Sequence, residues 1–513
     1  MIENLIAELE RKREKLKELG GEDRRKKQHD KGKLDARERL ELLFDDGIFM
    51  ELDPFVKHRC VFFGMDKKDI PAEGVICAVG TVNGRVTFAF SQDFTSAGGS
   101  VGEMGAKKMV KTIELAARAG APVVGINDGG GARIQEGVDA LSGYGHIFMA
   151  NAKYSGVIPQ IAVIAGPCAG GAAYSPALMD MVIVVDKISQ MFITGPQVIK
   201  AVTGETISAE ELGGADVHFT VSGNAHFKAP TDKEAINLVK LILSYLPQNW
   251  KTLPQSSTAP SADIIPELDK IIPIDPKQPY NMKDVINLVA DSNTFLEFYA
   301  GFAPNAITGF ARIEGKVVGI VANQPSVWAG SLDINAADKI SYFVRLCNAY
   351  NIPIVNLIDV PGFLPGVNQE FGGIIRHGAK MLYAYAEATV PKVSIILRKA
   401  YGGAYLAMCS KEMGADFVFA WPTAEIAVMG PEGAVNIVFK KEIAASDDPE
   451  KTRQAKIAEY REKFSTPYFA ASRGYIDNII KPSETKVYIA NALKILETKM
   501  SEKIKKKAGL IPL

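Results

Sequence analysis

The first 45 residues and the rest of the chain differ in their pattern of apolar and polar positions. In residues 1–45, Leu5, Leu9 and Leu16 stand among Glu and Lys residues, and Asp35-Ala-Arg-Glu38 is a capping-box sequence. This pattern predicts a helical arm that is either solvated or packed on a partner. From about residue 74, short β-rich runs alternate with Gly-rich turns and helical stretches; three such runs are residues 86–90, 122–126 and 161–165. The alternation predicts an α/β fold.

The chain repeats itself after about 231 residues. Four segments recur in order at offsets of 231 to 235: residues 121–128 with 352–359, 158–172 with 390–404, 191–196 with 426–431, and 97–100 with 328–331. Four ordered matches at nearly one offset are hard to produce by chance, and a period this long is that of a duplicated domain rather than a solenoid. The sequence therefore predicts two tandem copies of one domain.

A polar, Pro-rich stretch within residues 248–279 marks the boundary between the copies. We expect an N-terminal domain at 1–253 that includes the helical arm, a linker at 254–279, and a C-terminal domain at 280–513. Each half is long enough for its own core.

Composition narrows the class of protein. Lys+Arg and Asp+Glu both number 59, so no overall basic field would attract nucleic acid or an anionic membrane. The five cysteines form no C-x-x-C pair, which argues against a zinc ribbon and a disulfide framework. The N-terminus is charged too early for a signal peptide, and no apolar run reaches the roughly 20 residues of a membrane span. We expect a soluble, cytoplasmic protein without a metal.

Each half contains one strand-to-helix turn that is suited to binding an anion. A buried-strand pattern runs into Gly170-Gly-Ala172 in the first half and into Gly402-Gly-Ala404 in the second. Glycines let a ligand approach the backbone, and the free N–H groups at a helix start favour negative charge. One Gly-Gly-Ala alone would more simply be a tight turn. Its recurrence at equivalent positions favours a pair of oxyanion holes.

Nucleotide-binding loops of known type are absent. Residues 128–136 resemble a dinucleotide loop, but Ile134 stands where G-x-G-x-x-G requires its last glycine, and no G-x-x-x-x-G-K-[ST] occurs. A Rossmann dehydrogenase and a P-loop enzyme are therefore disfavoured.

Side chains that could act as nucleophiles or metal ligands have simpler interpretations. Ser175 lacks the G-x-S-x-G elbow, and Cys168 stands in an apolar run where a buried, inert thiol is expected. His218 and His226 are eight residues apart and have no companions at metal-ligand spacing. We expect all four to be structural.

Six motifs in order resemble the carboxyltransferase subunits of propionyl-CoA carboxylase and of methylmalonyl-CoA decarboxylase, and the similarity covers nearly the whole chain. They lie at residues 128–137, 166–177, 359–366, 372–380, 398–405 and 424–431, with a matching entry segment at 32–39 and ending at 509–513. The resemblance implies two crotonase-like domains of the ClpP/crotonase β-β-α superhelix type. It also implies a homo-oligomer, with a hexamer expected, whose active sites lie at dimer interfaces.

The family's site residues transfer onto the two glycine turns. The resemblance implies that the amides of Gly170 and Gly171 hold the thioester oxygen of an acyl-CoA enolate, and that those of Gly403 and Ala404 hold the ureido oxygen of biotin. Leu406 occupies a position linked to acyl-chain preference. Arg133 is the candidate for contacting a CoA phosphate, with a salt-bridged loop anchor as the equal alternative.

The resemblance also implies the reaction and its partners. Carboxybiotin releases CO₂, the biotin anion takes the α-proton of the acyl-CoA, and the enolate attacks CO₂, so the cofactor is the base. No Met-Lys-Met biotinylation site or ATP-grasp domain is found in the sequence. Biotin is therefore expected on a separate biotin carboxyl carrier protein, with propionyl-CoA and methylmalonyl-CoA as the expected substrate pair.

Several alternatives stay open at this point. The remaining partner is either a biotin carboxylase subunit, which gives an ATP-driven ligase, or a membrane decarboxylase subunit, which gives a sodium-pumping decarboxylase. A crotonase-type hydratase or hydrolase would need a side-chain acid or base beside Gly170 and would leave the second turn unexplained. A structural scaffold subunit that has lost activity is disfavoured by the intact Gly-Gly-Ala in both halves.

Overall fold

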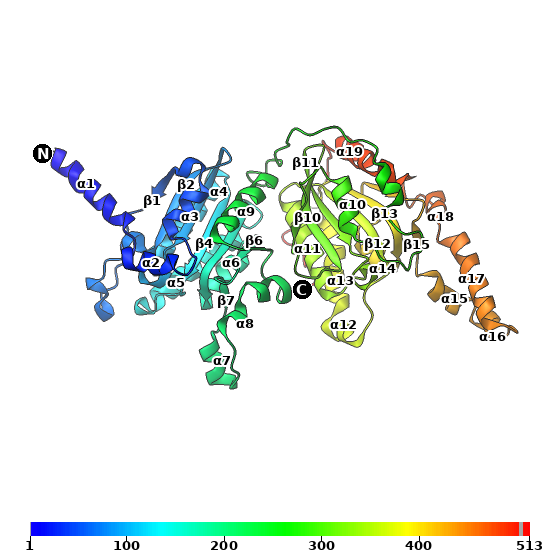
Figure 1. The fold of residues 1–513 in the computed structure, drawn as a ribbon, viewed down its shortest axis with the longest axis horizontal. Coiled ribbons are helices and arrows are strands. Elements are labelled where there is room, and N and C mark those ends of the chain that lie inside the picture. Colours follow the sequence, from blue (N-terminus) through cyan, green and yellow to red (C-terminus); the bar gives the residue numbers. More distant parts are fainter. Residues whose placement is uncertain (1, 502–505) are drawn as a thin grey trace. The chain divides into compact units, whose positions relative to one another are not determined.

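The chain folds into two compact units, residues 1–253 and 254–513, each built on one mixed sheet of eight strands (Figure 1). The computed structural model describes residues 2–501 and 506–513. The Pro-rich segment 254–279 packs on the second unit, where the Leu268 side chain is buried.

The strands of the first unit are β1 Phe49–Leu52, β2 Val75–Val82, β3 Arg85–Gln92, β4 Val123–Gly129, β5 Gln160–Ala169, β6 Met181–Val185, β7 Gln190–Phe192 and β8 Phe227–Ala229. Its helices are α1 Ile2–Lys17, α2 Glu22–His29, α3 Ala36–Leu43, α4 Glu103–Ala119, α5 Val138–Tyr154, α6 Tyr174–Leu178, α7 Pro196–Thr203, α8 Ala209–Gly213 and α9 Asp232–Tyr245.

The strands of the second unit are β9 Leu296–Phe298, β10 Ala306–Ile313, β11 Lys316–Asn323, β12 Ile354–Val360, β13 Lys392–Tyr401, β14 Phe417–Ala420, β15 Glu425–Ala427 and β16 Asn478–Ile479. Its helices are α10 Met282–Val289, α11 Ile334–Ala349, α12 Val367–Gly372, α13 Ile374–Glu387, α14 Gly402–Ala407, α15 Pro431–Val438, α16 Lys440–Ala444, α17 Pro449–Phe464, α18 Pro467–Ser472 and α19 Thr485–Ile495.

The two sheets have the same topology. In order they are β1-β2-β3-β4-β5-β6-β8, with β7 beside β5, and β9-β10-β11-β12-β13-β14-β16, with β15 beside β13. An antiparallel hairpin, β2–β3 or β10–β11, leads into a parallel ladder in each unit. The first hairpin turns at Asn83-Gly84, both with positive φ, as a two-residue type I′ turn requires. The internal duplication that the sequence predicts is therefore present as two copies of one sheet.

Local sequence signals account for several elements. Asp35 caps α3, accepting from the N–H of Glu38, whose side chain in turn accepts from the N–H of Asp35. The three β-rich runs lie in β3, β4 and β5, which are almost wholly buried, as expected for strands of a covered parallel ladder. Both predictions are confirmed.

A buried lysine fastens the same helix to the sheet in each unit. Lys108 of α4 donates to the carbonyls of Ala72 and Val75, at 2.7 Å each. Lys339 of α11, 231 residues later, lies 2.7 to 3.2 Å from four carbonyl oxygens, those of Tyr299, Phe302, Ala303 and Ala306. Burial lowers the pKa of Lys339 to about 7, although Glu297 and Asp333 oppose the shift.

This lowered pKa predicts a pH-dependent contribution to stability. An unfolded lysine titrates near 10.5, so between about pH 7 and 10.5 the unfolded state binds more protons and the contribution of Lys339 to stability rises with pH. We expect the unfolding midpoint of wild type, relative to that of Lys339→Met, to rise from pH 7 to pH 9.5, measured by thermal denaturation. The control Lys440→Met, exposed on α16, should give a constant difference from wild type; the same constancy for Lys339→Met would contradict the prediction.

Candidate active site

The two candidate sites begin at a β-bulge that recurs in both units. In the first, Asn127 pairs with Ile164 but Gly129 pairs with Cys168, so β5 contains two extra residues opposite Asp128. In the second, the same irregularity in β13 lies opposite Asp359. Bulges bend a strand and change the direction of the chain beyond it. Here they direct β5 and β13 into the two Gly-Gly-Ala turns.

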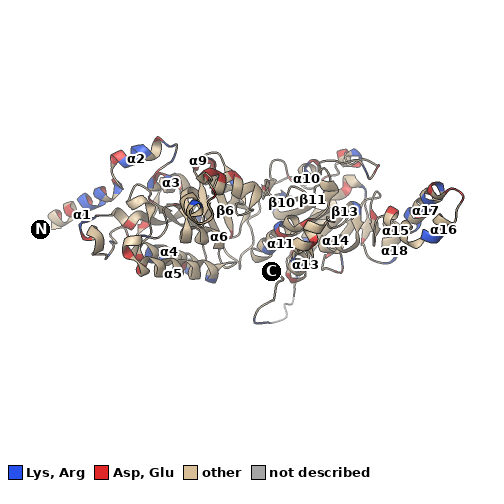
Figure 2. Ribbon diagram, turned by 90° about the horizontal axis from the view of Figure 1, so that it is seen from below, with Lys and Arg blue, Asp and Glu red and all other residues tan. Residues whose placement is uncertain are grey.

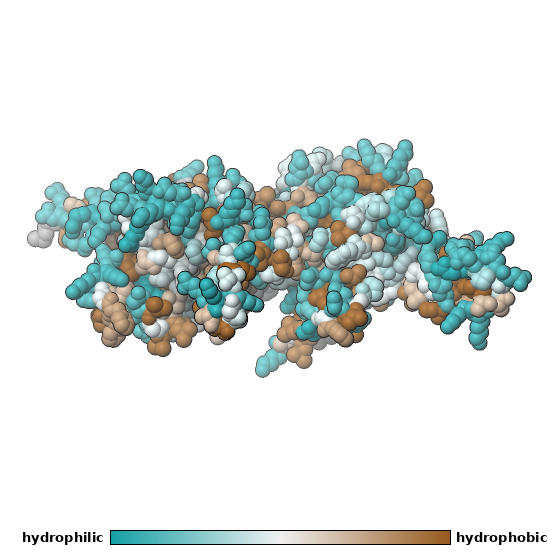
Figure 3. Space-filling model, turned by 60° about the horizontal axis from the view of Figure 1, so that its bottom comes forward, coloured by the Kyte–Doolittle hydropathy of each residue, from teal (hydrophilic) through white to brown (hydrophobic). Residues whose placement is uncertain are grey.

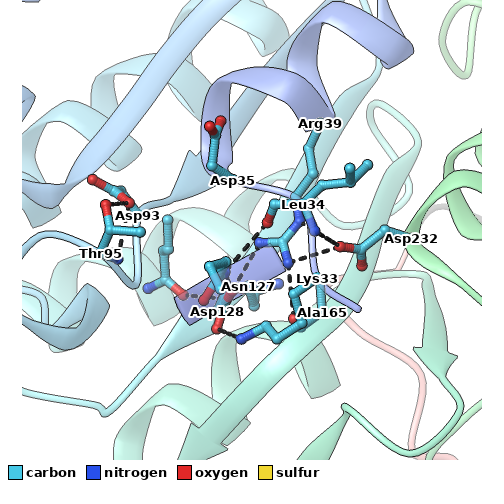
Figure 4. A network of polar contacts seen from close by, with 12 residues as sticks. Lys33, Leu34, Asp35, Arg39, Asp93, Thr95, Asn127, Asp128, Ala165 and Asp232 are labelled. Atoms are coloured by element: carbon cyan, nitrogen blue, oxygen red, sulfur yellow. Dashed lines mark hydrogen bonds and ion pairs between the residues drawn. The ribbon is translucent and has the colours of Figure 1, made fainter. Parts of the chain in front are cut away.

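Asp128 is completely buried in the first unit, where cations from the N-terminal arm surround it (Figure 4). Its Oδ1 accepts from Lys33 Nζ at 2.7 Å, and its Oδ2 accepts from Arg39 Nη1 at 2.9 Å and from Gln28 Nε2 at 2.8 Å. Arg39 also donates to the bulge carbonyl of Ala165 at 3.0 Å. The arm thus fixes the bulged strand from outside the sheet.

A second carboxylate completes this cluster. Asp232, at the start of α9, accepts from Arg39 Nη2 at 3.0 Å and from the backbone N–H of Leu34 at 2.7 Å. The cluster contains two carboxylates and two cations, so its formal charges balance. Such compensation is required, since an unpaired buried charge is costly.

Asp359 is equally buried in the second unit, but its cation comes from the bulged strand itself. Arg398 Nε donates to Oδ2 at 3.0 Å, and the N–H of Lys399 donates to Oδ1 at 3.1 Å. Arg398 also donates to the carbonyls of Asp275 and Gln278, which ties segment 254–279 to β13. One buried carboxylate therefore lies at each bulge, and the two units neutralise it with cations from different elements.

The turns after the bulges have the same backbone geometry. Gly170 and Gly402 lie in the left-handed region, with φ of 62° and 57°. This conformation favours glycine, and a Cβ on Gly402 would lie 2.8 Å from the carbonyl oxygen of Val428. By contrast, Gly403 has no heavy atom within 4 Å of where its Cβ would be. The first glycine of each pair adopts the left-handed conformation that the turn requires, and Gly403 leaves its outer face open.

Each turn contains backbone N–H groups that have no acceptor within the helix. Gly170–Ala173 forms one 3₁₀ turn that leads into α6, and α14 begins at Gly402. The first N–H groups of a helix have no intrahelical acceptor. The four predicted site residues, Gly170, Gly171, Gly403 and Ala404, all lie in these first turns, and Gly171 and Gly403 are exposed. Each unit therefore presents backbone donors that can stabilise an oxyanion.

Ordered side chains support both turns. Aromatic rings lie next to the first: a Cβ on Gly171 would lie 3.8 Å from Tyr144 and 3.9 Å from Phe148. Beside the second, the hydroxyl of Tyr401 donates to Glu425 of β15, and Glu425 in turn pairs with Arg461 of α17 at 3.2 Å.

The other two predicted residues lie in different surroundings. Arg133 is buried; its Nη1 pairs with Glu73 and lies 2.8 Å from Glu136, and its Nη2 donates to the carbonyl of Ser100 at 2.9 Å. These contacts are the ones expected of a salt-bridged loop anchor, the alternative to a contact with a CoA phosphate. Leu406 is 40% exposed on α14, two residues beyond Ala404.

Side chains near the turns have structural roles. Ser175 donates to Asn151 Oδ1 at 2.9 Å, and burial raises the pKa of the Cys168 thiol to about 12. Nε2 of His218 lies 2.7 Å from the carbonyl oxygen of Met191. His226 accepts from the N–H of Val182, and burial lowers its pKa to about 3. The structural interpretation of these four residues agrees with the contacts.

One group of side chains in the described part of the chain has ligand atoms close enough together for a metal. His29, Asp35 and Glu38 offer atoms within 4.8 Å of one another. Both carboxylates already cap α3, and Asp35 also accepts from Arg25 Nε at 2.8 Å. The helix cap explains this cluster.

Sequence reasoning missed the carboxylates and cations at the bulges. Lys33 and Arg39 stand within the entry segment at 32–39, which served only to recognise the family. The repeat could have revealed the second pair, since Arg398 occupies the position of Gly166. A Cβ on Gly166 would lie 1.9 Å from Asp128 Oδ1 and 2.7 Å from Lys33 Nζ. The side chain of Arg398 thus replaces cations that come from elsewhere in the first unit.

Comparison with known proteins identifies the class of enzyme. A family model described as the carboxyl transferase domain matches residues 27–511. The chain belongs to the carboxyl transferase family and is an acyl-CoA carboxyltransferase. Among the described residues, no helix is both long and apolar enough to cross a membrane.

The chain is similar over its full length to characterised members of the family. It is 56% identical to the methylmalonyl-CoA decarboxylase subunit alpha of Propionigenium modestum, covering 99% of each chain. It is 52% identical to the propionyl-CoA carboxylase carboxyltransferase subunit of Haloferax mediterranei, covering 100% of each.

A solved structure confirms the fold. The transcarboxylase 12S crystal structure, a hexamer with methylmalonyl-coenzyme A bound, matches with a TM-score of 0.98 and 55% identity, covering 100% of this chain and 99% of that one. The predicted family and the α/β fold of two crotonase-like domains are confirmed.

The buried cluster around Asp128 predicts a large effect of a single substitution. Arg39→Met should lower the free energy of unfolding by about 3–5 kcal/mol, because it leaves Asp232 without a cation and Asp128 with only one. The measurement is urea or thermal unfolding followed by circular dichroism.

Lys57→Met provides the control, since Lys57 lies in the same unit and pairs with Asp69 at the surface, at 2.9 Å. Surface pairs contribute little. Equal losses for the two variants would contradict the importance of the cluster.

Proposed function

We propose that this protein moves a carboxyl group between biotin on a separate carrier protein and a short acyl-CoA, with propionyl-CoA and methylmalonyl-CoA as the substrate pair. The observation that carries the proposal is the pair of equivalent turns, each with free amides at a helix start. Names of relatives support the substrate pair, because they include methylmalonyl-CoA decarboxylase and propionyl-CoA carboxylase subunits. Both activities share this half-reaction.

The amides of Gly170 and Gly171 hold the thioester oxygen in this mechanism. Removal of the α-proton, or loss of the carboxylate, places negative charge on that oxygen. Donors already in position stabilise the charge without reorganisation, and each is worth about 3 kcal/mol of barrier. Next to Gly171, the rings of Tyr144 and Phe148 offer an apolar surface for the acyl group.

The amides of Gly403 and Ala404 hold the ureido oxygen of biotin. Biotin supplies the nitrogen that carries the carboxyl group and takes the proton. The open space around Gly403 suits the close approach of a ring, and the Tyr401–Glu425 hydrogen bond keeps the preceding strand in place. No side-chain base is required, which fits the structural roles of Ser175 and Cys168.

A groove of about 630 Å³ in the first unit suits the nucleotide part of coenzyme A. Its lining combines apolar Met65 and Ile70 with the cations of Arg24 and Lys68. The carboxylates of Glu18 and Asp69 also line it, and Asp69 is paired with Lys15. It also includes Ser96, Ala97, Ser100 and Arg133, which lie close to the loop after β4. The groove supports CoA binding by the first unit, with Arg133 shaping the loop.

Self-association completes the proposal, with the first unit of one copy facing the second unit of another in a hexamer. Hydrophobic areas are exposed on the surface (Figure 3). In the first unit they include Ile134, Val138 and Leu141, and in the second Phe371 and Ile375, all more than two-thirds exposed. Exposed apolar patches of this kind mark interaction sites. The relative solved as a hexamer supports the same assembly.

Incubation of the purified protein with methylmalonyl-CoA and free biotin should give biotin-dependent decarboxylation. Gly171→Pro and Ala404→Pro each remove one N–H in a first helical turn, where proline is tolerated, and should each reduce the rate about 100-fold or more. The rate is measured by the loss of methylmalonyl-CoA.

Ala404→Ser keeps the N–H and is the matched control for the second turn. No activity from folded, oligomeric wild type would contradict the proposed reaction. Full activity of folded Ala404→Pro would show that the second turn has another role.

Leu406 is proposed to limit the acyl chain. Leu406→Ala removes bulk near the second turn and should raise the ratio of kcat/KM for butyryl-CoA over propionyl-CoA about tenfold, the scale of one methylene in an apolar pocket. The ratio is measured with carboxybiotin as donor. Leu241→Ala, at an equally exposed leucine on α9, should leave the ratio unchanged. An unchanged ratio for Leu406→Ala would remove this residue from the acyl site.

A further inference from the structure

Helix α1 carries an apolar stripe that the described residues of its own unit leave largely exposed. None of its 16 residues is buried. Ile2, Leu5, Ile6 and Leu9 recur at the spacing of one helix face and are 37% to 67% exposed. A free-standing helix of this length is marginal in water, and tertiary packing of an apolar face is what normally stabilises it. We therefore expect this stripe to pack against a second apolar surface.

A groove lies alongside this stripe. It has a volume of about 1010 Å³ and is lined on the helix side by residues that include Leu5, Leu9 and Leu16, and on the other side by segments 54–57 and 69–72. Phe55, in the first of these segments, is 48% exposed. An ion pair between Lys15 and Asp69, at 2.7 Å, joins α1 to the second segment. The groove runs from Leu5 along α1 to Glu18, and its leucines offer an apolar surface between charged side chains to a second helix.

The distribution of charge along α1 indicates which kind of helix could lie in the groove. Residues 3–10 contain the acidic Glu3, Glu8 and Glu10, whereas residues 11–17 contain five basic side chains and one acidic one, Glu14 (Figure 2). A second α1 laid antiparallel places the acidic half of each helix beside the basic half of the other. A parallel copy would place like charges together, at a cost. The helix is thus complementary to itself in one orientation only.

We propose that α1 of a second copy of this chain lies antiparallel in the groove, around a twofold axis close to Leu9. Because a twofold contact uses the same patch on both copies, each α1 fills the groove of the other. Leu9 then faces the partner's Leu9, and Glu8 lies near the partner's Lys12. The contact uses no residue of the glycine turns, and Leu9 lies outside the groove assigned to CoA, although the two grooves share segment 69–71.

Cysteine cross-linking tests the contact in the full-length protein. In a Cys60→Ser background, which removes the one half-exposed thiol, Leu9→Cys should form a disulfide between chains under mild oxidation. Ala7→Cys, on the opposite face of α1 and outside the lining of the groove, is the matched control and should stay uncross-linked. Bands at twice the chain mass on a non-reducing gel give the readout. Equal cross-linking of the two variants, or none by Leu9→Cys, would overturn the proposal.

Charge exchange tests the orientation. In the Leu9→Cys protein, Glu8→Lys alone and Lys12→Glu alone should each reduce the cross-linked fraction several-fold. Glu8 and Lys12 also pair with each other within α1, at 2.7 Å. Co-expression of the two single variants restores the pairs between chains but not the pair within each helix, and it should restore the cross-link. A cross-link that ignores both single exchanges, or one that joins Leu9→Cys to a different protein in a cell extract, would overturn the antiparallel self-contact. Carboxyl transfer measured on the same samples should persist throughout, which separates failure of this contact from failure of the proposed function.

Discussion

Two carboxylates without access to water, Asp128 and Asp359, constrain both candidate sites. Each lies opposite a bulge, at the point where the parallel ladder gives way to a glycine turn. A regular strand would continue straight and pair along its whole length, so the bulge is what brings a helix start to the end of the sheet. The bulge leaves polar backbone groups inside the protein, and the carboxylate with its cation satisfies part of them. Without this pair, the turn would have no fixed direction.

The two units neutralise their buried carboxylates with cations from different parts of the chain. This difference depends on which residue stands at one equivalent position of the two repeats. Gly166 leaves the space beside Asp128 empty, and Lys33 and Arg39 enter it from the arm. At the equivalent position, Arg398 carries its own cation and needs no arm; its remaining donor instead holds the carbonyls of Asp275 and Gln278. The same buried carboxylate thus attaches α2 and α3 to the first unit and segment 254–279 to the second. The two domains could differ in the source of the cation, because each buried carboxylate needs only that its charge be neutralised.

Features encoded within a few residues, or by the repeat, could be predicted from the sequence. The capping box at Asp35, the buried strands and the paired glycine turns belong to this group. The counter-ions of Asp128 could not be predicted, because Lys33 lies 95 residues away along the chain and no local pattern records such a pairing. Arg133 shows the same limit. Its residue type fits a phosphate contact as well as an ion pair, and only the positions of Glu73 and Glu136 distinguish the two.

In the proposed mechanism, the chemistry of the site rests on backbone rather than on side chains. Ser175, Cys168 and His226 are committed to hydrogen bonds or to the core, which leaves the amides of the turns as the groups that can meet developing charge. An amide N–H is present at every residue except proline, so substitutions on the outer face of a turn can change the shape of the pocket while the donors remain. Leu406 is such a position, because its side chain is exposed and it lies two residues beyond the last donor on the same helix. If Leu406 limits the acyl chain as proposed, a substitution there changes the acyl group that the site accepts without removing a donor.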